Sequence, residues 1–392
     1  MKKNKGSLLR NDGFQSLLSS LLCIVGGLLV GYVVLLIIEP SGASTAILAV
    51  MKSFFRYPGK LMWKYFGQNL VRTVPLLMCA LSVLFSYKVG MFNIGVAGQY
   101  VAGACISLYA ALAWGMPWYV CLVLSMAVGG ALAAISGFLK TKCNVNVVIS
   151  GIMLNWITLY LTNLVLGQVK SPNSPYTLTL RGNNSSALIP SLGLEKLFNG
   201  EKSVTIAIPL AILIAVGIWV LLEKTKFGYE LKATGHNYHA AQYAGMKENW
   251  NIIAAMFISG ALAGLGAGLF YLTGIEEWET TVSSVPAMGF SGIAVAFLGG
   301  LNPIGSILAG FFIQYITFGG GFVDLNVYSS QISSLISSLI IYLCAFAGFF
   351  KYVMQTRMRK KDEKRAAQQA VKEAETEAAQ QAALAQEGGD EK

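Results

Sequence analysis

The stretch Asn251-Ile-Ile-Ala-Ala-Met-Phe-Ile-Ser-Gly260-Ala-Leu-Ala-Gly264-Leu-Gly-Ala-Gly268-Leu-Phe-Tyr271 decides the class of fold. It contains no Asp, Glu, Lys or Arg. A helix needs about 20 mostly apolar residues to cross a hydrocarbon core of roughly 30 Å, and this stretch is long enough. Gly260, Gly264 and Gly268 repeat every fourth residue, which places them on one helix face. Small residues let helix backbones approach closely in a membrane, so this face predicts a tight helix contact.

Apolar runs of the same kind recur along the whole chain. Of its 392 residues, 55% are hydrophobic and 12% are charged, whereas a typical soluble domain is about 25% charged. We therefore predict an all-α, polytopic membrane protein with about ten transmembrane helices. The expected spans are 17–38, 69–87, 95–115, 118–138, 146–166, 205–222, 251–271, 286–300, 304–319 and 332–350.

The positions of the basic residues predict the orientation, because cytoplasmic loops are enriched in Lys and Arg. With both termini in the cytoplasm, 20 of the 29 Lys and Arg residues fall inside and 9 outside. The chain then divides into a basic N-tail (1–16), a transmembrane domain (17–350) and a cytoplasmic tail (351–392) rich in Ala, Gln and Glu. The basic part of this tail suits the inner lipid surface, and the formal net charge of +10 gives no stripe suited to nucleic acid.

One region fits this arrangement poorly. The stretch 40–68 carries Lys52, Arg56, Lys60 and Lys64 but is placed outside. Its alternating apolar and basic residues predict an amphipathic helix that lies in the membrane interface. The span 286–300 is short and rich in glycine, so we expect that it re-enters the membrane within a shell of protein.

A polar stretch from Lys224 to Trp250 interrupts two apolar spans and falls in the cytoplasm. We expect a short helix there, with Asn237 as its N-cap and Gly245 as its stop. Its small residues at i, i+3, i+4 and i+7 would share one face; they are Asn237, Ala240, Ala241 and Ala244. A helix this short is marginal in water, so it predicts a partner packed upon it. An ordinary solvated connector is the alternative.

Signatures of catalysis are absent from the sequence. It has no G-x-x-x-x-G-K-[ST] phosphate loop, no His-Glu-x-x-His and no nucleophile elbow. His236 and His239 lack the carboxylates or thiols that would complete a metal site. The central parts of the predicted spans also lack ionisable residues, which ion-coupled carriers keep at membrane depth. We therefore predict no catalytic residues, no metal and no cofactor in this chain, and a source of energy outside the spans.

Uncharged polar side chains do occur within or beside the spans. Asn93, Gln99 and Asn155 carry amides that need hydrogen-bond partners in hydrocarbon, either on a neighbouring helix or on a solute in a wet cavity. Phe92 and Trp156 could stack on a planar ring. As a set these residues predict a path for an uncharged, hydrogen-bonding solute.

Four segments in order resemble a family of ABC-importer permeases for nucleosides, ribose-type sugars and branched-chain amino acids. The segment KVGMFNIGVAGQ (88–99) resembles its "GLFNIGxEGQ" signature, and ISGIMLN (149–155) resembles the "ITTIMLN" stretch of its nucleoside branch. GFSGIAVAFLG (289–299), followed by NPIG (302–305), resembles "GFDGIAVALLG…NPIG". The polar stretch at 232–246 is similar to the coupling segment "RAxGxNxxAAxxAGI". The resemblance runs from about residue 20 to 350.

This sequence departs from the family pattern at three polar or acidic positions. They are occupied here by Ala97, Val147 and Ser291. The last of these joins the candidates for the substrate path, because it stands where the family has an aspartate.

The resemblance implies that 17–350 is the permease domain of an ATP-driven nucleoside importer in the bacterial plasma membrane, with its coupling loop at 223–250. Separate ATPase subunits would hold the ATP and bind this loop at Gly235, Asn237, Ala240, Ala241, Ala244 and Gly245. A second permease, identical or paralogous, would complete the path, and an extracellular binding lipoprotein would deliver the solute. Import of simple sugars or branched-chain amino acids by the same architecture, and a stand-alone ion-coupled carrier, are the alternatives.

Overall fold

The computed structural model describes residues 12–323, residues 355–360 and scattered positions between 335 and 368. The predicted tenth span at 332–350, the N-terminal residues before 12 and most of the C-terminal tail therefore lie outside the described residues. The long helices are α2 (Asp12–Ile38), α3 (Ala43–Lys52), α4 (Lys60–Lys88), α5 (Val96–Leu112), α6 (Trp118–Cys143), α7 (Val147–Leu166), α10 (Ala207–Lys224), α11 (Lys226–His236), α13 (Glu248–Tyr271), α14 (Met288–Leu298) and α15 (Pro303–Gly320). The short ones are η1 (Ser53–Arg56), η2 (Gly167–Val169), α8 (Leu180–Asn183), η3 (Ser185–Ala187), α9 (Leu194–Leu197) and α12 (Tyr238–Tyr243).

The all-α membrane fold predicted from the sequence is confirmed. Among the described residues, six helices are long and apolar enough to cross a membrane, and α5, α14 and part of α2 are shorter apolar helices. Each of the first nine predicted spans therefore coincides with a helix, and the count of ten stays a prediction. The only extended pairing within 12–323 is two isolated bridges, Lys170 with Thr177 and Tyr176 with Glu279.

Helix α13 lies at the centre and packs against α4, α5 and α6. Its glycines produce the close contact that their spacing predicts. A methyl group added at Gly260 would lie 2.2 Å from the carbonyl oxygen of Gly129, and one at Gly264 would lie 2.2 Å from that of Ser125. Both partners are on α6, so the two helix backbones touch along this face.

Helix α4 is the second central element, packed against α13, α14 and α15. It contains Pro75, which removes one helical hydrogen bond and favours a bend. It begins at Lys60, nine residues before the predicted span 69–87, so the amphipathic stretch 40–68 is divided among α3, η1 and the start of α4. Its predicted place in the membrane interface stays a prediction.

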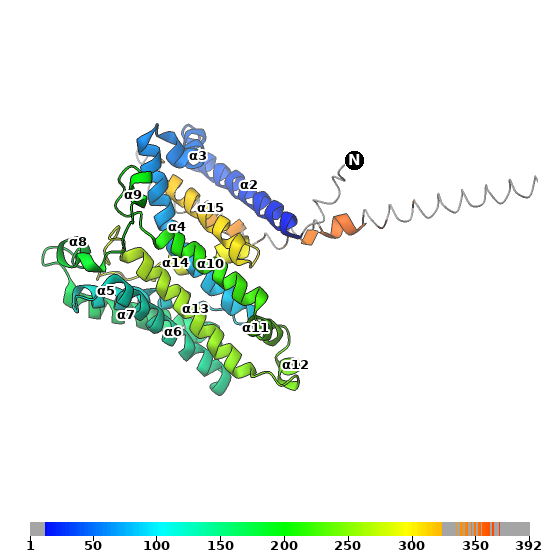
Figure 1. Ribbon diagram of the computed structural model, residues 1–392. Coiled ribbons are helices and arrows are strands. Elements are labelled where there is room, and N and C mark those ends of the chain that lie inside the picture. The colour runs from blue at the N-terminus through cyan, green and yellow to red at the C-terminus, as the bar shows by residue number, and fades with distance from the viewer. Residues whose placement is uncertain are drawn as a thin grey trace, which may run out of the picture.

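The connecting segments gather at opposite ends of the long helices. Figure 1 shows α11 and α12 at one end of the bundle, and α8 and α9 at the other. The sequence predicts the first end inside the cell and the second outside. Helix α14 has 11 residues, about 16 Å at 1.5 Å per residue, and is too short to cross the bilayer alone.

Candidate functional site

The predicted coupling segment, residues 223–250, contains the two helices α11 and α12. The side chain of Asn237 accepts a hydrogen bond from the amide of Ala240 at 3.0 Å, so it caps α12 as predicted. Gly245 follows α12 with φ at +79°, a conformation that glycine adopts without strain. Both predicted ends of the short helix are confirmed.

The residues predicted to bind an ATPase divide into two groups. Asn237, Ala240, Ala244 and Gly245 are exposed. In contrast, Ala241 is buried against this chain, with 3% of its surface accessible. Gly235 is exposed too, but its backbone contacts this chain at the turn after α4. The surface that α12 offers to a partner therefore consists of the first group together with Tyr243, which is 93% exposed.

The predicted coupling segment is hydrogen-bonded to α13. The hydroxyl of Tyr238 donates to Glu248 at 3.4 Å and to Asn249 at 3.3 Å. Loss of hydration and then the charge of Glu248 raise the pKa of Tyr238, so its hydroxyl stays protonated and can donate at neutral pH. Thr234 on α11 accepts a hydrogen bond from Asn251 at 3.1 Å, and both side chains are buried.

Two of the predicted path residues belong to an amide cluster, which we define as Asn93, Gln99, Ser82 and Ser259. The Asn93 amide donates to Gln99 at 2.9 Å and to Ser259 at 2.9 Å, and Gln99 donates back to Asn93 at 3.1 Å. The Ser259 hydroxyl donates to the carbonyl oxygen of Ser82 at 2.8 Å and so links α13 to α4. All four side chains are buried, so the cluster joins α4, α5 and α13 through hydrogen bonds made within this chain.

Asn155 on α7 fixes the turn that precedes α5. Its carboxamide oxygen accepts from the amide of Gly98 at 2.7 Å, and its nitrogen donates to the carbonyl of Ile94 at 3.1 Å. Asn155 is 2% exposed. These contacts favour the helix-bonding alternative for Asn93, Gln99 and Asn155 in the state described, and their contact with a solute stays a prediction.

The remaining path candidates are more accessible. Phe92 and Ser291 are half-buried, and Trp156 is 41% exposed and stacks on Tyr160 with ring centroids 6.1 Å apart. A methyl group added at Gly289 would lie 2.7 Å from the side chain of Ala97. Two of the departures from the family pattern, Ala97 and Ser291, therefore occur on helices that touch, α5 and α14.

One buried amide was not singled out from the sequence. Asn69 on α4 is fully buried, and neither its oxygen nor its nitrogen has a hydrogen-bond partner among the residues described. Ser82 and Ser259 were missed as well, because a serine within an apolar run carries little signal. For Ser259 the neighbouring glycine repeat was the available hint, since it marks a close contact.

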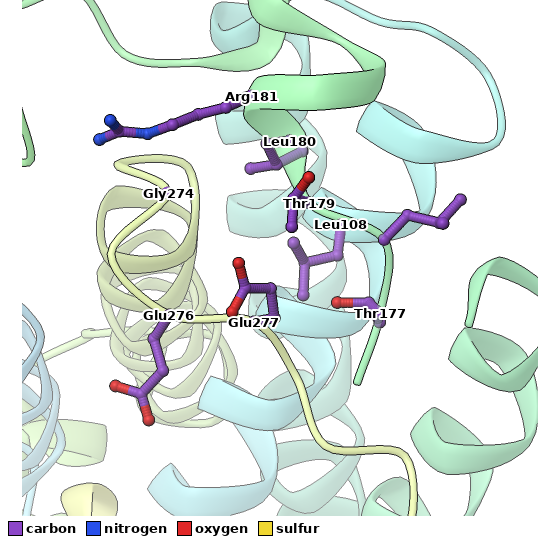
Figure 2. Close-up of a pocket in the computed structure, with 9 residues that line it drawn as sticks. Leu108, Thr177, Thr179, Leu180, Arg181, Gly274, Glu276 and Glu277 are labelled. Atoms are coloured by element: carbon purple, nitrogen blue, oxygen red, sulfur yellow. The ribbon is translucent and has the colours of Figure 1, made fainter. Parts of the chain in front are cut away.

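The predicted outer end carries a pocket of about 190 Å³. Its polar lining includes Thr177, Arg181 and Glu277, and its apolar lining includes Leu108. Figure 2 shows Arg181 extending over the turn at Gly274, with Glu277 and Leu108 beneath it. The pocket lies where the loop after α7 meets the loop after α13, and a loop pairing of this kind leaves no sequence pattern.

The sequence of this chain matches a known family of membrane proteins. The apolar helices and the uncharged polar core are typical of the membrane-embedded part of a transporter. The chain belongs to the family described as "Branched-chain amino acid transport system / permease component", which matches residues 65–345. It is therefore a multi-pass membrane protein and the permease component of an ABC transporter, in which the ATPase is a separate subunit.

Individual relatives resemble this chain over most of its length. The guanosine ABC transporter permease protein NupP of Bacillus subtilis is 35% identical over 297 residues, covering 75% of this chain and 82% of the relative. The nucleoside ABC transporter permease protein NupB of Lactococcus lactis is 32% identical over 62% of this chain and 68% of the relative. The glucose ABC transporter permease protein TsgB13 of Haloferax volcanii is 30% identical over 65% and 69%. No solved structure matches the chain.

Proposed function

We propose that this chain is the transmembrane permease subunit of an ATP-driven importer that takes up nucleosides. The observation that carries the proposal is the similarity to guanosine and nucleoside permeases over most of the chain. The uncharged polar core is consistent with it, because nucleosides are neutral and bind through hydrogen bonds and ring stacking. The glucose permease TsgB13 keeps import of a simple sugar as the second candidate.

The partners follow from the same proposal. Two ATPase subunits bind the coupling segments from the cytoplasm and hold the ATP, so this chain needs no cofactor of its own. A second permease, identical or paralogous, completes the path in the plasma membrane, and an extracellular binding lipoprotein delivers the nucleoside. ATP binding favours one state of the permease pair only if the ATPase contacts differ between states, and the exposed surface of α12 supports that role.

Tyr243 supports the assignment of α12 as the docking helix. Tyrosine is enriched among residues that dominate binding energy at protein interfaces, and a side chain that is 93% exposed gains most from burial by a partner. In this arrangement Tyr243 enters a pocket of the ATPase while Ala240 and Ala244 allow its surface to approach the helix.

The test is uptake of a radiolabelled nucleoside into proteoliposomes that contain the permease pair, the ATPase and the lipoprotein. Uptake should require ATP on the side of the vesicle membrane that corresponds to the cytoplasm. Unlabelled nucleosides should compete with the labelled one, whereas sugars and branched-chain amino acids should not. Competition by glucose or ribose alone would transfer the proposal to sugars. Accumulation driven by an ion gradient without ATP would refute it.

A further inference from the structure

The coupling segment touches the transmembrane helices at a point where two glycines meet. Gly235, near the end of α11, lies against Gly90, in the turn between α4 and α5. A methyl group added at Gly235 would lie 2.3 Å from the carbonyl oxygen of Lys88 and 2.9 Å from the amide nitrogen of Gly90. Gly90 has φ at +80°, and a methyl group there would lie 3.3 Å from the carbonyl oxygen of Gly235. The two backbones are therefore in direct contact, and any side chain at Gly235 would separate them.

Helix α11 is held against two other membrane-spanning helices. Its Lys232 pairs with Glu223 on α10 at 3.0 Å, and its Thr234 accepts the buried hydrogen bond from Asn251 on α13. The buried contact costs more to break than the half-exposed ion pair, because an unpaired buried donor loses its hydration as well. A displacement applied to α12 therefore moves α11 together with the start of α13.

The turn at Gly90 leads directly into the amide cluster. Asn93 follows three residues later and bonds Gln99 on α5 and Ser259 on α13. The cluster is fully buried, so a shift of the turn must either break these hydrogen bonds or carry the cluster with it. Packed interiors change between discrete arrangements rather than deforming smoothly. The contact at Gly235 is thus the place where α11 can act on the junction of α4, α5 and α13.

We propose that Gly235 and Gly90 form a positioning pair that transmits movement of the coupling segment to the amide cluster. The inference rests on the proposed function, because it takes the ATPase to be what moves α12. Neither glycine contacts the solute in this proposal; each acts by keeping two backbones in contact. Movement of α11 toward the turn at Gly90 is transmitted because the two backbones are already in contact. Movement of α11 away from the turn is transmitted because α11 is hydrogen-bonded to α13.

The experiment compares three alanine variants of the complete complex in proteoliposomes. Gly235→Ala inserts a methyl group directly against backbone atoms. Gly90→Ala places one 3.3 Å from the nearest atom of Gly235, but in a backbone conformation, φ +80°, that L residues rarely adopt. Gly217→Ala is the matched control, since nothing lies within 4 Å of a methyl group at that position on α10. Solute uptake and ATP hydrolysis are measured on the same vesicles, and the ATPase retained by each permease is measured by co-purification.

We expect all three variants to retain the ATPase and to hydrolyse ATP. Uptake per ATP should fall by about twofold to thirtyfold in Gly235→Ala, the range that residues in coupling networks typically produce. It should fall less in Gly90→Ala and stay unchanged in Gly217→Ala. A drop caused by weaker docking would instead lower the retained ATPase and the hydrolysis together.

Wild-type uptake per ATP in an assembled Gly235→Ala complex would overturn the inference. If that variant does not assemble, Gly90→Ala decides in its place, and a wild-type ratio there overturns the inference equally. Failure of the proposed function is a separate result, because the wild-type complex would then show no ATP-dependent uptake of any nucleoside.

Discussion

Two buried asparagines should respond in opposite ways to the same substitution. Asn155 on α7 is 2% exposed and Asn69 on α4 is fully buried. Asn155 bonds the amide of Gly98 and the carbonyl of Ile94, whereas Asn69 has no partner among the described residues. Leucine has nearly the shape of asparagine without its polar atoms. A comparison of Asn155→Leu with Asn69→Leu therefore isolates the contribution of the hydrogen bonds to the free energy of unfolding.

The magnitudes follow from which groups are left unpaired. Asn155→Leu leaves one buried backbone N–H and one buried C=O without a partner, each at about 1–3 kcal/mol, for a total loss of about 2–6 kcal/mol. Asn69→Leu removes two polar atoms that have no partner among the described residues, so the free energy of unfolding should stay equal or rise by about 1–3 kcal/mol. The two variants should therefore differ by at least about 2 kcal/mol, which separates their melting temperatures by several degrees.

The assay is thermal unfolding of the purified permease in one detergent, followed by circular dichroism, with uptake measured on the same variants. Asn155→Leu should melt below the wild type, and Asn69→Leu should melt with it or above it. Equal destabilisation of both variants would refute the reasoning. An Asn155→Leu variant that melts like the wild type but does not transport would show that Asn155 acts on the solute rather than on the turn before α5.

Three further predictions concern the proposed docking helix, the central helix contact and an ion pair at the predicted outer end. Tyr243→Ala should weaken binding of the ATPase by about 2 kcal/mol, or roughly thirtyfold, in a titration of detergent-solubilised permease; unchanged affinity would exclude it as an anchor. Gly264→Leu should abolish the monodisperse peak in size-exclusion chromatography, because even a methyl group would lie 2.2 Å from the carbonyl oxygen of Ser125; a normal peak would contradict the contact. Arg72→Ala should change stability by less than about 1 kcal/mol, since its pair with Glu276, at 3.4 Å, is partly exposed; a larger loss by thermal melting would show that the pair is shielded from water.

Features that depend on a few neighbouring residues could be predicted from the sequence. The cap at Asn237 and the stop at Gly245 were found because each is set by the backbone of its own turn. The glycine face of α13 was found because the period of a helix alone brings Gly260 and Gly264 together. The apolar spans were found because the bilayer sets their length.

The start of α4 could not be predicted in the same way. Hydropathy places the start of the span at residue 69, because the charged Lys60 and Lys64 precede it. The helix nevertheless begins at Lys60. Its first turns are stabilised by aromatic contacts with a distant helix, including Tyr65 with Phe318 at a centroid separation of 6.1 Å. Contacts between residues so far apart in sequence leave no local pattern.

The candidate site shows the same division. The sequence drew attention to Asn93 and Gln99 because amides are costly in hydrocarbon, but it left open whether a helix or a solute satisfies them. The answer for the state described depends on Ser259, which lies 166 positions beyond Asn93. Likewise Gly235 was assigned to a partner, and only the fold reveals its contact with the turn at Gly90.

The hydrogen bonds of the amide cluster are weak enough to be rearranged when the permease changes between two conformational states. Moving a two-state equilibrium from 1:99 to 99:1 requires about 5.5 kcal/mol, and a neutral hydrogen bond contributes about 0.5–1.5 kcal/mol net. A few bonds among Asn93, Gln99 and Ser259 are therefore of the size that a docked ATPase could rearrange in one step. A buried ion pair at the same junction would cost about 3–5 kcal/mol when one partner is lost, and it would hold the helices in a single state. In the proposed function, the lack of charge in this core therefore also keeps the free-energy difference between the two states within the range that ATPase contacts at α12 can supply.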